Sequence, residues 1–186
     1  MKKIIFRALM LLSMAIMVAF TVVPAPHQIP DNNRVAPAVV YQKPPATALT
    51  LSTPNLTVVQ NNEVCVEVTA TGFDQILTMQ YSMNWDPHVL KFKDLRRFGL
   101  SSLDTRNFGQ HLLDKGVLTF SWYDQKLVGM THEDGFVLYE MCFDAIGKPG
   151  SETTIEFTSK PTVVEISNAA GVFLDLRTET GKVNIE

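Results

Sequence analysis

The stretch NWDPHVLKF, residues 84–92, allows two interpretations, and the fold of the chain depends on which one is correct. It brings an aromatic ring, a carboxylate, an imidazole and a lysine close together, as an active site or a ligand-binding site does. The same letters also fit a corner between two strands. Pro87 presets its own φ and pushes Asp86 towards an extended conformation, and an aspartate side chain accepts hydrogen bonds from the free N–H groups of a turn. The flanking residues decide between the two.

Both flanks alternate as strands do. Residues 78–86 switch between an apolar and a polar set at every position, which is the period of a strand with one buried face. The apolar set is Met79, Tyr81, Met83 and Trp85, and the polar set is Thr78, Gln80, Ser82 and Asn84. An apolar pattern resumes at Val89, after the proline. We therefore predict that Trp85 is the last inward residue of a strand and that Asp86-Pro87 forms a corner.

From Leu49 onward, the chain repeats this pattern of short alternating segments separated by turn residues. Short β-type runs such as EVCVEVTATGF, GVLTFSWYD and GFVLYEMCFDAIG are separated by turn segments such as QNN, DKG and GKPGS. Strands this short and this regularly punctuated indicate an all-β sandwich or barrel. Further apolar sets are Leu118, Phe120 and Trp122 in residues 117–123, and Val137, Tyr139, Met141 and Phe143 in residues 136–143. Because large aromatic side chains supply most of a sandwich core, we expect Trp85 and Trp122 to be buried.

The first 48 residues are expected to precede this domain. A start with three basic residues is followed by an apolar run, residues 8–20, which has the length of a secretory signal rather than of a membrane span. We assign a signal peptide to residues 1–23, with an uncleaved N-terminal anchor as the alternative. Residues 24–48 hold six prolines and no consistent period, as a largely extended linker does. The predicted domain spans residues 49–186 of a secreted or cell-surface protein.

The charge balance argues against nucleic acid as a partner. Removal of the predicted signal peptide takes away three of the 16 Lys and Arg, which leaves 13 against 19 Asp and Glu, a net charge of about −6. No run of basic residues remains in the mature chain. We therefore expect it to bind neither nucleic acid nor an anionic membrane surface, and to contain no membrane span.

No group of residues predicts an enzyme. Hydrolysis needs two carboxylates about 5 to 10 Å apart in a cleft. Asp124, Glu133 and Asp134 are the candidates, but Asp134-Gly135 is typical of a turn entering a strand, and no nucleophile, base and orienting group converge. The four histidines stand singly, without metal-ligand spacing. We expect no catalytic residues, no metal and no cofactor.

The corner is also where a family resemblance begins. A strand that closes in aromatic-Asp-Pro and continues as x-V-L-x-F resembles the cohesin domains of cellulosomal scaffolds. The pieces GVLTFSWYD, EDGFVLYEMCFDAIGKPGSETTIEF and the closing GKVNIE follow in a similar order, so the resemblance covers nearly all of residues 49–186. It implies a nine-stranded jelly-roll or Ig-like β-sandwich without catalytic activity. Such domains bind protein modules called dockerins in systems of polysaccharide breakdown.

The resemblance also implies a binding face. Cohesins bind through the outer face of the sheet that holds the third, fifth and sixth strands. The corresponding residues of this chain are Thr78, Gln80, Ser82, Ser121, Tyr123, Leu138 and Glu140. One tyrosine and one leucine within a polar patch suit protein recognition, although an ordinary solvated sheet face fits the same residues.

Two other functions stay open. One is a carbohydrate-binding module on the same architecture, for which Tyr41, Tyr123 and Phe173 are the aromatic candidates. The other is a small structural subunit of a cell-surface assembly, which self-association in solution would distinguish.

Arguments about the two cysteines conflict. Export and an even count favour a disulfide between Cys65 and Cys142. Alternation turns both sulfurs outward, Cys65 with Glu67 and Cys142 with Glu140. The cohesin resemblance implies that their strands belong to opposite sheets, about 10 Å apart, so that outward sulfurs are too distant to bond. Whether the bridge forms stays open, and if it forms we expect a β-bulge beside one of the cysteines.

Overall fold

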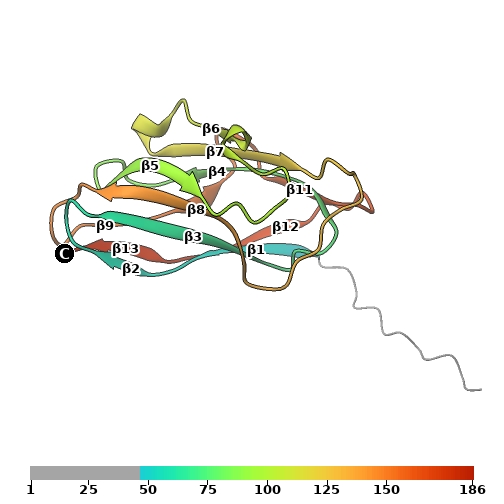
Figure 1. Cartoon of the computed structure of the whole chain (residues 1–186), viewed down its shortest axis with the longest axis horizontal. Coiled ribbons are helices and arrows are strands. Elements are labelled where there is room, and N and C mark those ends of the chain that lie inside the picture. Colours follow the sequence, from blue (N-terminus) through green and yellow to red (C-terminus); the bar gives the residue numbers. More distant parts are fainter. Residues whose placement is uncertain (1–46) are drawn as a thin grey trace, which may run out of the picture. The chain divides into compact units, whose positions relative to one another are not determined.

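The computed structural model describes residues 47–186, which form a β-sandwich (Figure 1). The predicted signal peptide, residues 1–23, and the predicted linker up to residue 46 lie outside the described residues. Strand β1 (Ala48–Thr53) begins one residue before the predicted start of the domain. Within residues 47–186, no helix has the length and apolar content that crossing a membrane requires.

Most strands belong to two sheets. Sheet I has the order β12-β1-β3-β8-β5, and sheet II has the order β10-β4-β7-β6 with β11 also paired to β4. A small third sheet has the order β2-β13-β9. The other strands of sheet I are β12 (Asp175–Thr180), β3 (Glu63–Thr71), β8 (Phe136–Ala145) and β5 (Leu90–Arg96). Sheet II consists of β10 (Glu156–Thr158), β4 (Ile76–Asn84), β7 (Val117–Tyr123), β6 (Phe108–Gly109) and β11 (Glu165–Asn168). The third sheet consists of β2 (Leu56–Val58), β13 (Lys182–Ile185) and β9 (Glu152–Thr154), and two 3₁₀ turns, η1 (Thr105–Asn107) and η2 (Leu113–Lys115), lie in connections.

The predicted all-β sandwich is confirmed, with strands more finely divided than the nine expected. Pro54, which cannot donate a backbone hydrogen bond, separates β1 from β2, and Gly181 separates β12 from β13. The two breaks lie side by side, because a Cβ on Gly181 would stand 2.2 Å from the carbonyl carbon of Pro54. Only glycine permits this approach, so β1 and β2 run parallel to β12 and β13 on either side of it.

Aromatic side chains from both sheets fill the space between them. The hydroxyl oxygens of Tyr81 in β4 and Tyr139 in β8 are 2.9 Å apart across that space. Trp85 and Trp122 are 6% and 2% exposed, which confirms the prediction that both are buried. Their indole N–H groups donate to backbone carbonyls at 2.9 and 3.1 Å, so neither buried ring leaves its donor unpaired.

Residues 84–92 form the predicted corner, in which β4 ends and β5 begins. The Asp86 carboxylate accepts a hydrogen bond from the His88 N–H at 2.8 Å, as an aspartate in a turn does. The Trp85 indole donates to the Leu90 carbonyl at 2.9 Å and ties the two strands together across the corner. The aromatic ring and the carboxylate therefore build a strand connection and not a working site.

A β-bulge near the start of β8 changes which residues face inward there. Val68 of β3 pairs with Tyr139, whereas the next residue, Thr69, pairs with Val137. Leu138 is the extra residue, and it is 0% exposed. Val137 therefore shares the outer side with Thr69, so its assignment to the inward set was wrong. From Tyr139 onward the set points inward as predicted.

Cys65 and Cys142 form a disulfide, with Cα atoms 4.0 Å apart. The expectation that their strands lie in opposite sheets was wrong, because β3 and β8 are antiparallel neighbours in sheet I and pair Cys65 with Cys142. The expected bulge beside a cysteine is absent from this pairing, whose register runs unbroken from Glu63 to Val68. The nearest shift is in the neighbouring strand β5, where Lys93 is the extra residue. Outward side chains on facing positions of adjacent strands are already close enough to bond.

Candidate binding surface

Four of the residues predicted for binding lie together on the outer face of sheet II. β4 and β7 are antiparallel neighbours, with Thr78 opposite Tyr123 and Gln80 opposite Ser121. The alternate residues of both strands are apolar and point into the core. The outer face of these two strands is therefore polar apart from Val117 and the Tyr123 ring, which is 56% exposed.

β11 adds residues to this face that the sequence did not indicate. It pairs with β4 and places Glu165 opposite Gln80 and Ser167 opposite Thr78. The hydroxyl oxygens of Thr78 and Ser167 are 2.8 Å apart, although the two residues are 89 positions apart in the chain. A strand of four residues carries too short an alternation for its neighbour to be inferred from sequence.

The other three predicted residues are not available on this face. β8 belongs to sheet I, so the expectation that it shares a sheet with β4 and β7 was wrong. Leu138 is buried at the β8 bulge, and Glu140 faces out from sheet I, with a carboxylate oxygen 3.8 Å from the guanidinium of Arg97. Ser82 lies in β4 but is 0% exposed. Its hydroxyl accepts from the Thr162 N–H at 2.8 Å and donates to the Thr162 carbonyl at 3.2 Å.

The loop after β7 presents two apolar side chains in a fixed shape. Leu127 and Val128 are 67% and 66% exposed. Beneath them, the buried Asp124 carboxylate accepts hydrogen bonds from the backbone N–H groups of Lys126, Val128 and Gly129 at 3.0, 3.1 and 3.0 Å. These bonds lower the pKa of Asp124 below its usual value, and the bond from the Lys126 N–H has the largest effect. The Asp124 carboxylate thus organises the loop backbone and is not free for acid–base chemistry.

The loop between β11 and β12 is built in the same way. Asn168 is 3% exposed, and its side-chain oxygen accepts hydrogen bonds from the N–H groups of Ala170 at 3.1 Å and Val172 at 3.0 Å. Val172 and Phe173 are 52% and 69% exposed at the tip. A buried polar side chain therefore shapes this loop as well, and the loop again carries apolar residues outward.

The two loops meet where β4 begins. The Ala169 N–H donates to the Gln75 carbonyl at 2.8 Å, and a Cβ on Gly129 would stand 2.9 Å from the Ala169 Cβ. We call the four large, exposed hydrophobic side chains of these loops the apolar rim; they are Leu127, Val128, Val172 and Phe173. Leu127 and Val128 follow Tyr123 closely in the chain, and Phe173 pairs with Ser167 on the outer face of sheet II, so the rim adjoins that face.

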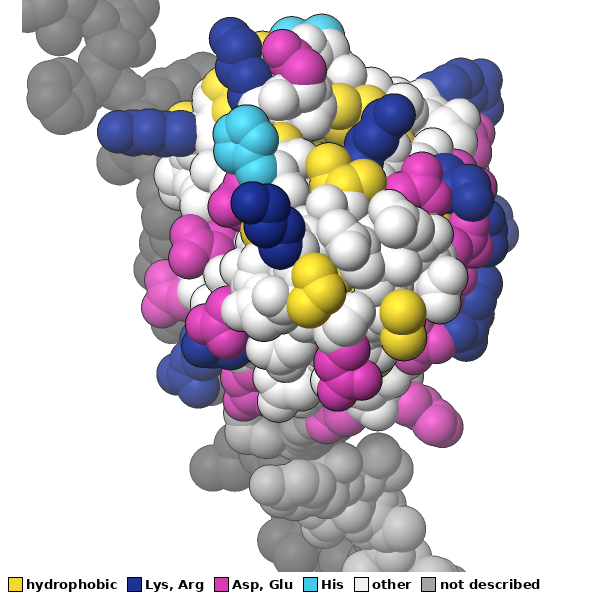
Figure 2. All heavy atoms as spheres, turned by 90° about the vertical axis from the view of Figure 1, so that its left-hand side faces the viewer, with side chains coloured by type: hydrophobic (Ala, Val, Ile, Leu, Met, Phe, Trp, Pro, Cys, Tyr) yellow, Lys and Arg dark blue, Asp and Glu magenta, His cyan; other side chains and the backbone are white. Residues whose placement is uncertain are grey.

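The opposite end of the sandwich differs in character. Figure 2 shows that end, where hydrophobic side chains form small separate spots among charged residues and histidine. The turns there are joined by backbone hydrogen bonds, from the Gln60 N–H to the Glu186 carbonyl and from the Ile146 N–H to the Val89 carbonyl. Scattered single hydrophobic residues are normal for a protein surface and need no partner to explain them.

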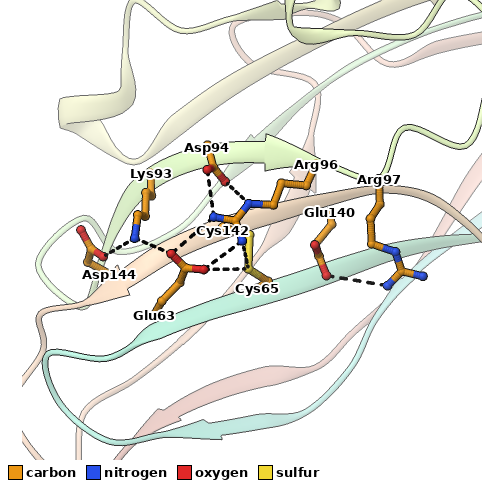
Figure 3. Close-up of polar contacts among 9 residues, drawn as sticks. All are labelled: Glu63, Cys65, Lys93, Asp94, Arg96, Arg97, Glu140, Cys142 and Asp144. Carbon is orange, nitrogen blue, oxygen red and sulfur yellow. Dashed lines mark hydrogen bonds and ion pairs between the residues drawn. A yellow bond between two sulfur atoms is a disulfide. The ribbon is translucent and has the colours of Figure 1, made fainter.

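The outer face of sheet I carries a charged network over the disulfide (Figure 3). Glu63 contacts the Lys93 ammonium and accepts a hydrogen bond from the Arg96 guanidinium at 2.9 Å. Arg96 also lies 2.9 Å from the Asp94 carboxylate and 3.8 Å from the Cys65 sulfur. The contacts with Lys93 and then Arg96 lower the pKa of Glu63. The charges of this network pair with one another.

One group of potential metal ligands occurs among residues 47–186, and it consists of Glu63, Cys65 and Cys142 within 4.8 Å of one another. Both sulfurs belong to the disulfide and therefore offer no thiolate to a metal. Asp134, another of the three carboxylates considered for catalysis, accepts a hydrogen bond from the Gly72 N–H at 2.8 Å in the turn before β8. This confirms the prediction that Asp134-Gly135 is a turn.

Comparisons with known proteins agree with this architecture. No protein-family model matches the chain, and neither does any curated protein. Among solved structures, the cohesin of a type I cohesin–dockerin complex from Clostridium thermocellum has a TM-score of 0.63 and 14% identity, covering 78% of this chain and 98% of that one. The sixth cohesin of scaffoldin B from Acetivibrio cellulolyticus, in complex with a dockerin, has a TM-score of 0.62 and 17% identity over 75% of this chain and 100% of that one. A non-cellulosomal cohesin from the archaeon Archaeoglobus fulgidus has a TM-score of 0.60 and 18% identity, covering 75% of this chain and 91% of that one.

The fold of residues 47–186 is therefore the cohesin-type β-sandwich, as the sequence resemblance indicated. At identities of 14–18%, the likeness defines the fold, and a function has to be argued from the surface.

Proposed function

We propose that this chain is a non-catalytic, exported recognition module that binds a protein partner through the outer face of sheet II. The observation that carries the proposal is the continuity of Tyr123 with the apolar rim, beside a polar face containing Gln80 and Ser121. Protein interfaces combine a few large apolar or aromatic anchors with polar surroundings, and a surface whose shape is already fixed loses less entropy on binding. Asp124 and Asn168 fix that shape here.

A dockerin-type module is the first candidate for the partner. The solved neighbours include cohesins in complex with dockerins. The sheet II face carries four of the seven residues that the cohesin resemblance implies for binding, namely Thr78, Gln80, Ser121 and Tyr123. A place in polysaccharide breakdown and a location outside the cell would follow from such a partner and from the predicted signal peptide.

A carbohydrate ligand is the second candidate, because two aromatic rings, Tyr123 and Phe173, are 56% and 69% exposed. Sugar-binding platforms stack several rings in a row, whereas on this face two strands separate the rings: Tyr123 lies opposite Thr78 of β4, and Phe173 lies opposite Ser167 of β11. Protein recognition is therefore the better supported of the two functions.

Calorimetry with purified modules tests the proposal. Dockerins of the type bound in the solved complexes, proteins captured from the producing organism's secreted fraction, and soluble cello- and xylo-oligosaccharides would each be titrated into the chain. The triple variant Gln80→Ala, Ser121→Ala and Tyr123→Ala should lose a protein ligand at least tenfold. A matched triple variant on the outer face of sheet I, Ser52→Ala, Glu67→Ala and Lys91→Ala, should keep it.

Each outcome separates the candidates. Equal affinity of the sheet II variant and the sheet I control would contradict the proposed face. Binding of oligosaccharides alone, with loss on changing Tyr123, would replace the protein partner by the carbohydrate ligand.

A further inference from the structure

Among residues 47–186, no further strand pairs with β12, which is an edge strand of sheet I. It pairs on one side with β1 in a parallel register that runs without interruption from Asp175 to Thr180. Every residue of β12 except Leu176 is exposed. An edge strand presents unpaired N–H and C=O groups, which form a template for a further strand.

Two backbone bonds fix which groups of β12 are free. The Asp175 N–H donates to the Thr47 carbonyl and the Gly181 N–H donates to the Thr53 carbonyl, both on the β1 side. Alternate residues of a strand direct their backbone groups to opposite sides, so the odd-numbered positions between these two also face β1. Leu176, Thr178 and Thr180 therefore direct their N–H and C=O groups away from the sheet.

The other edge of sheet I is protected, and β12 is not. β5 has a register shift at Lys93, and it carries a second exposed lysine, Lys91. Bulges and lysines are devices that stop edge strands from pairing. β12 has neither a bulge nor a proline nor a lysine between its bounds, and its outer side chains alternate in charge: Asp175, Arg177 and Glu179.

We infer that β12 pairs antiparallel with β12 of a second copy of this chain, around a two-fold axis at Thr178. In this register Arg177 of each copy stands opposite Glu179 of the other, and the outward backbone groups of Leu176 face those of Thr180. The two sheets I then form one continuous sheet. Opposite charges on facing positions favour a cross-strand pair, and like charges disfavour it.

Charge selects this register over its neighbours. A two-fold axis at Arg177 opposes two arginines and sets Asp175 against Glu179, and an axis at Glu179 opposes two glutamates. An axis at Leu176 opposes Asp175 and Arg177 favourably but leaves Glu179 and Thr180 unpaired. The axis at Thr178 alone combines opposite charges with use of all three outward-facing residues. The interface uses β12 and none of the residues Gln80, Ser121 and Tyr123 of the sheet II face.

Sedimentation velocity of the full chain, purified from a host that exports it, tests the inference over a range of concentrations. The chain should form a dimer as its concentration rises. Arg177→Glu places glutamates opposite each other twice and should weaken dimerisation about tenfold or more. The double variant Arg177→Glu and Glu179→Arg exchanges the two charges and should restore it. Lys148→Glu, an equal change of charge on an exposed loop residue, should leave it unchanged.

Mixing gives the sharpest test. Arg177→Glu and Glu179→Arg single variants should each remain monomeric, but their mixture should form a heterodimer, seen by energy transfer between two dyes. Thr178→Pro removes an N–H that points away from the sheet, so it should abolish the dimer while the melting temperature of the monomer stays nearly unchanged. A chain that stays monomeric at every concentration would overturn the inference, as would a dimer insensitive to Arg177→Glu and Thr178→Pro. The sheet II triple variant should dimerise normally, so this test does not depend on the proposed function.

Discussion

Cys65 and Cys142 stand directly opposite each other on neighbouring antiparallel strands, with Cα atoms 4.0 Å apart and their sulfurs bonded. The bridge joins positions 77 residues apart in the sequence, so it closes a long loop in the unfolded chain. A crosslink of that kind stabilises mainly by restricting the unfolded state.

The disulfide should therefore be detectable and stabilising. The unfolded, unreduced protein should contain no free thiol when titrated with Ellman's reagent. Replacing both cysteines by serine should lower the free energy of unfolding by about 2–4 kcal/mol in urea titrations. Two free thiols in the unreduced protein purified from an exporting host would show that the bridge does not form.

Trp122 and Tyr123 are sequence neighbours on opposite faces of β7, which makes them a matched pair. Trp122 is 2% exposed and Tyr123 is 56% exposed. Trp122→Ala should cost about 3–5 kcal/mol of stability, because it leaves a large cavity in the core. Tyr123→Ala should change stability by less than about 0.5 kcal/mol, as surface substitutions do. Urea unfolding measures both, and comparable losses for the two variants would contradict the face assignment.

The buried pair of Tyr81 and Tyr139 should make the protein sensitive to high pH. Burial raises the pKa of both hydroxyls well above the ordinary value, because the phenolate has no access to water. In the unfolded chain the hydroxyls titrate near pH 10, so their contribution to stability is fully present below that pH and declines as the pH rises above it.

The loss should reach about 1.4 kcal/mol per pH unit for each tyrosine. Urea titrations between pH 9 and pH 11 measure the slope, with Tyr81→Phe as the comparison. That variant leaves one buried phenol in place of two, so its stability should fall less steeply above pH 10. Identical slopes in the two proteins would show that Tyr81 is ionised in the folded state.

Asp124 should control the shape of the loop that carries Leu127 and Val128. Its pKa is lowered, so its contribution to stability is present above the unfolded value, about 3.9, and is lost as the pH falls through the folded value. Asp124→Asn removes the charge and one acceptor, and should speed hydrogen exchange at the N–H groups of Val128 and Gly129 at neutral pH. The β3 amides serve as the internal control and should exchange as slowly as before. Unchanged exchange at Gly129 would mean that the carboxylate does not hold the loop.

Local residue pattern was sufficient for much of the fold. The alternation around Trp85 predicted the inward face of β4, and Asp86-Pro87 predicted the corner that follows it. The same alternation turned Cys65 outward beside Glu67, where the structure places it. These predictions succeeded because the period of a strand and the preferences of a turn depend on residues within a few positions of one another.

The candidate site could be predicted only in part. Thr78, Gln80, Ser121 and Tyr123 come from two strands whose alternation is long and clear, so their common outward direction was readable. The prediction for Leu138 was wrong because a bulge inserts one residue and reverses the inward and outward sets before it. No residue type in this segment predicts a bulge. Phe173 was already an aromatic candidate in the sequence. Its position beside Ser167 depends on a loop shaped by the buried side chain of Asn168, and neither that burial nor the hydrogen bond can be inferred from the sequence.

The sequence by itself determined the class of fold, the inward and outward sets of the long strands and the corner at residues 84–92. Only the tertiary structure decided which strands became neighbours: β3 beside β8, which lets Cys65 reach Cys142, and β11 beside β4, which completes the open face. The physical reason is that alternation is set locally, whereas pairing is set by how both sheets bury their apolar faces together. The entropy of closing a chain loop changes slowly with its length, so sequence separation alone does not choose between distant partners.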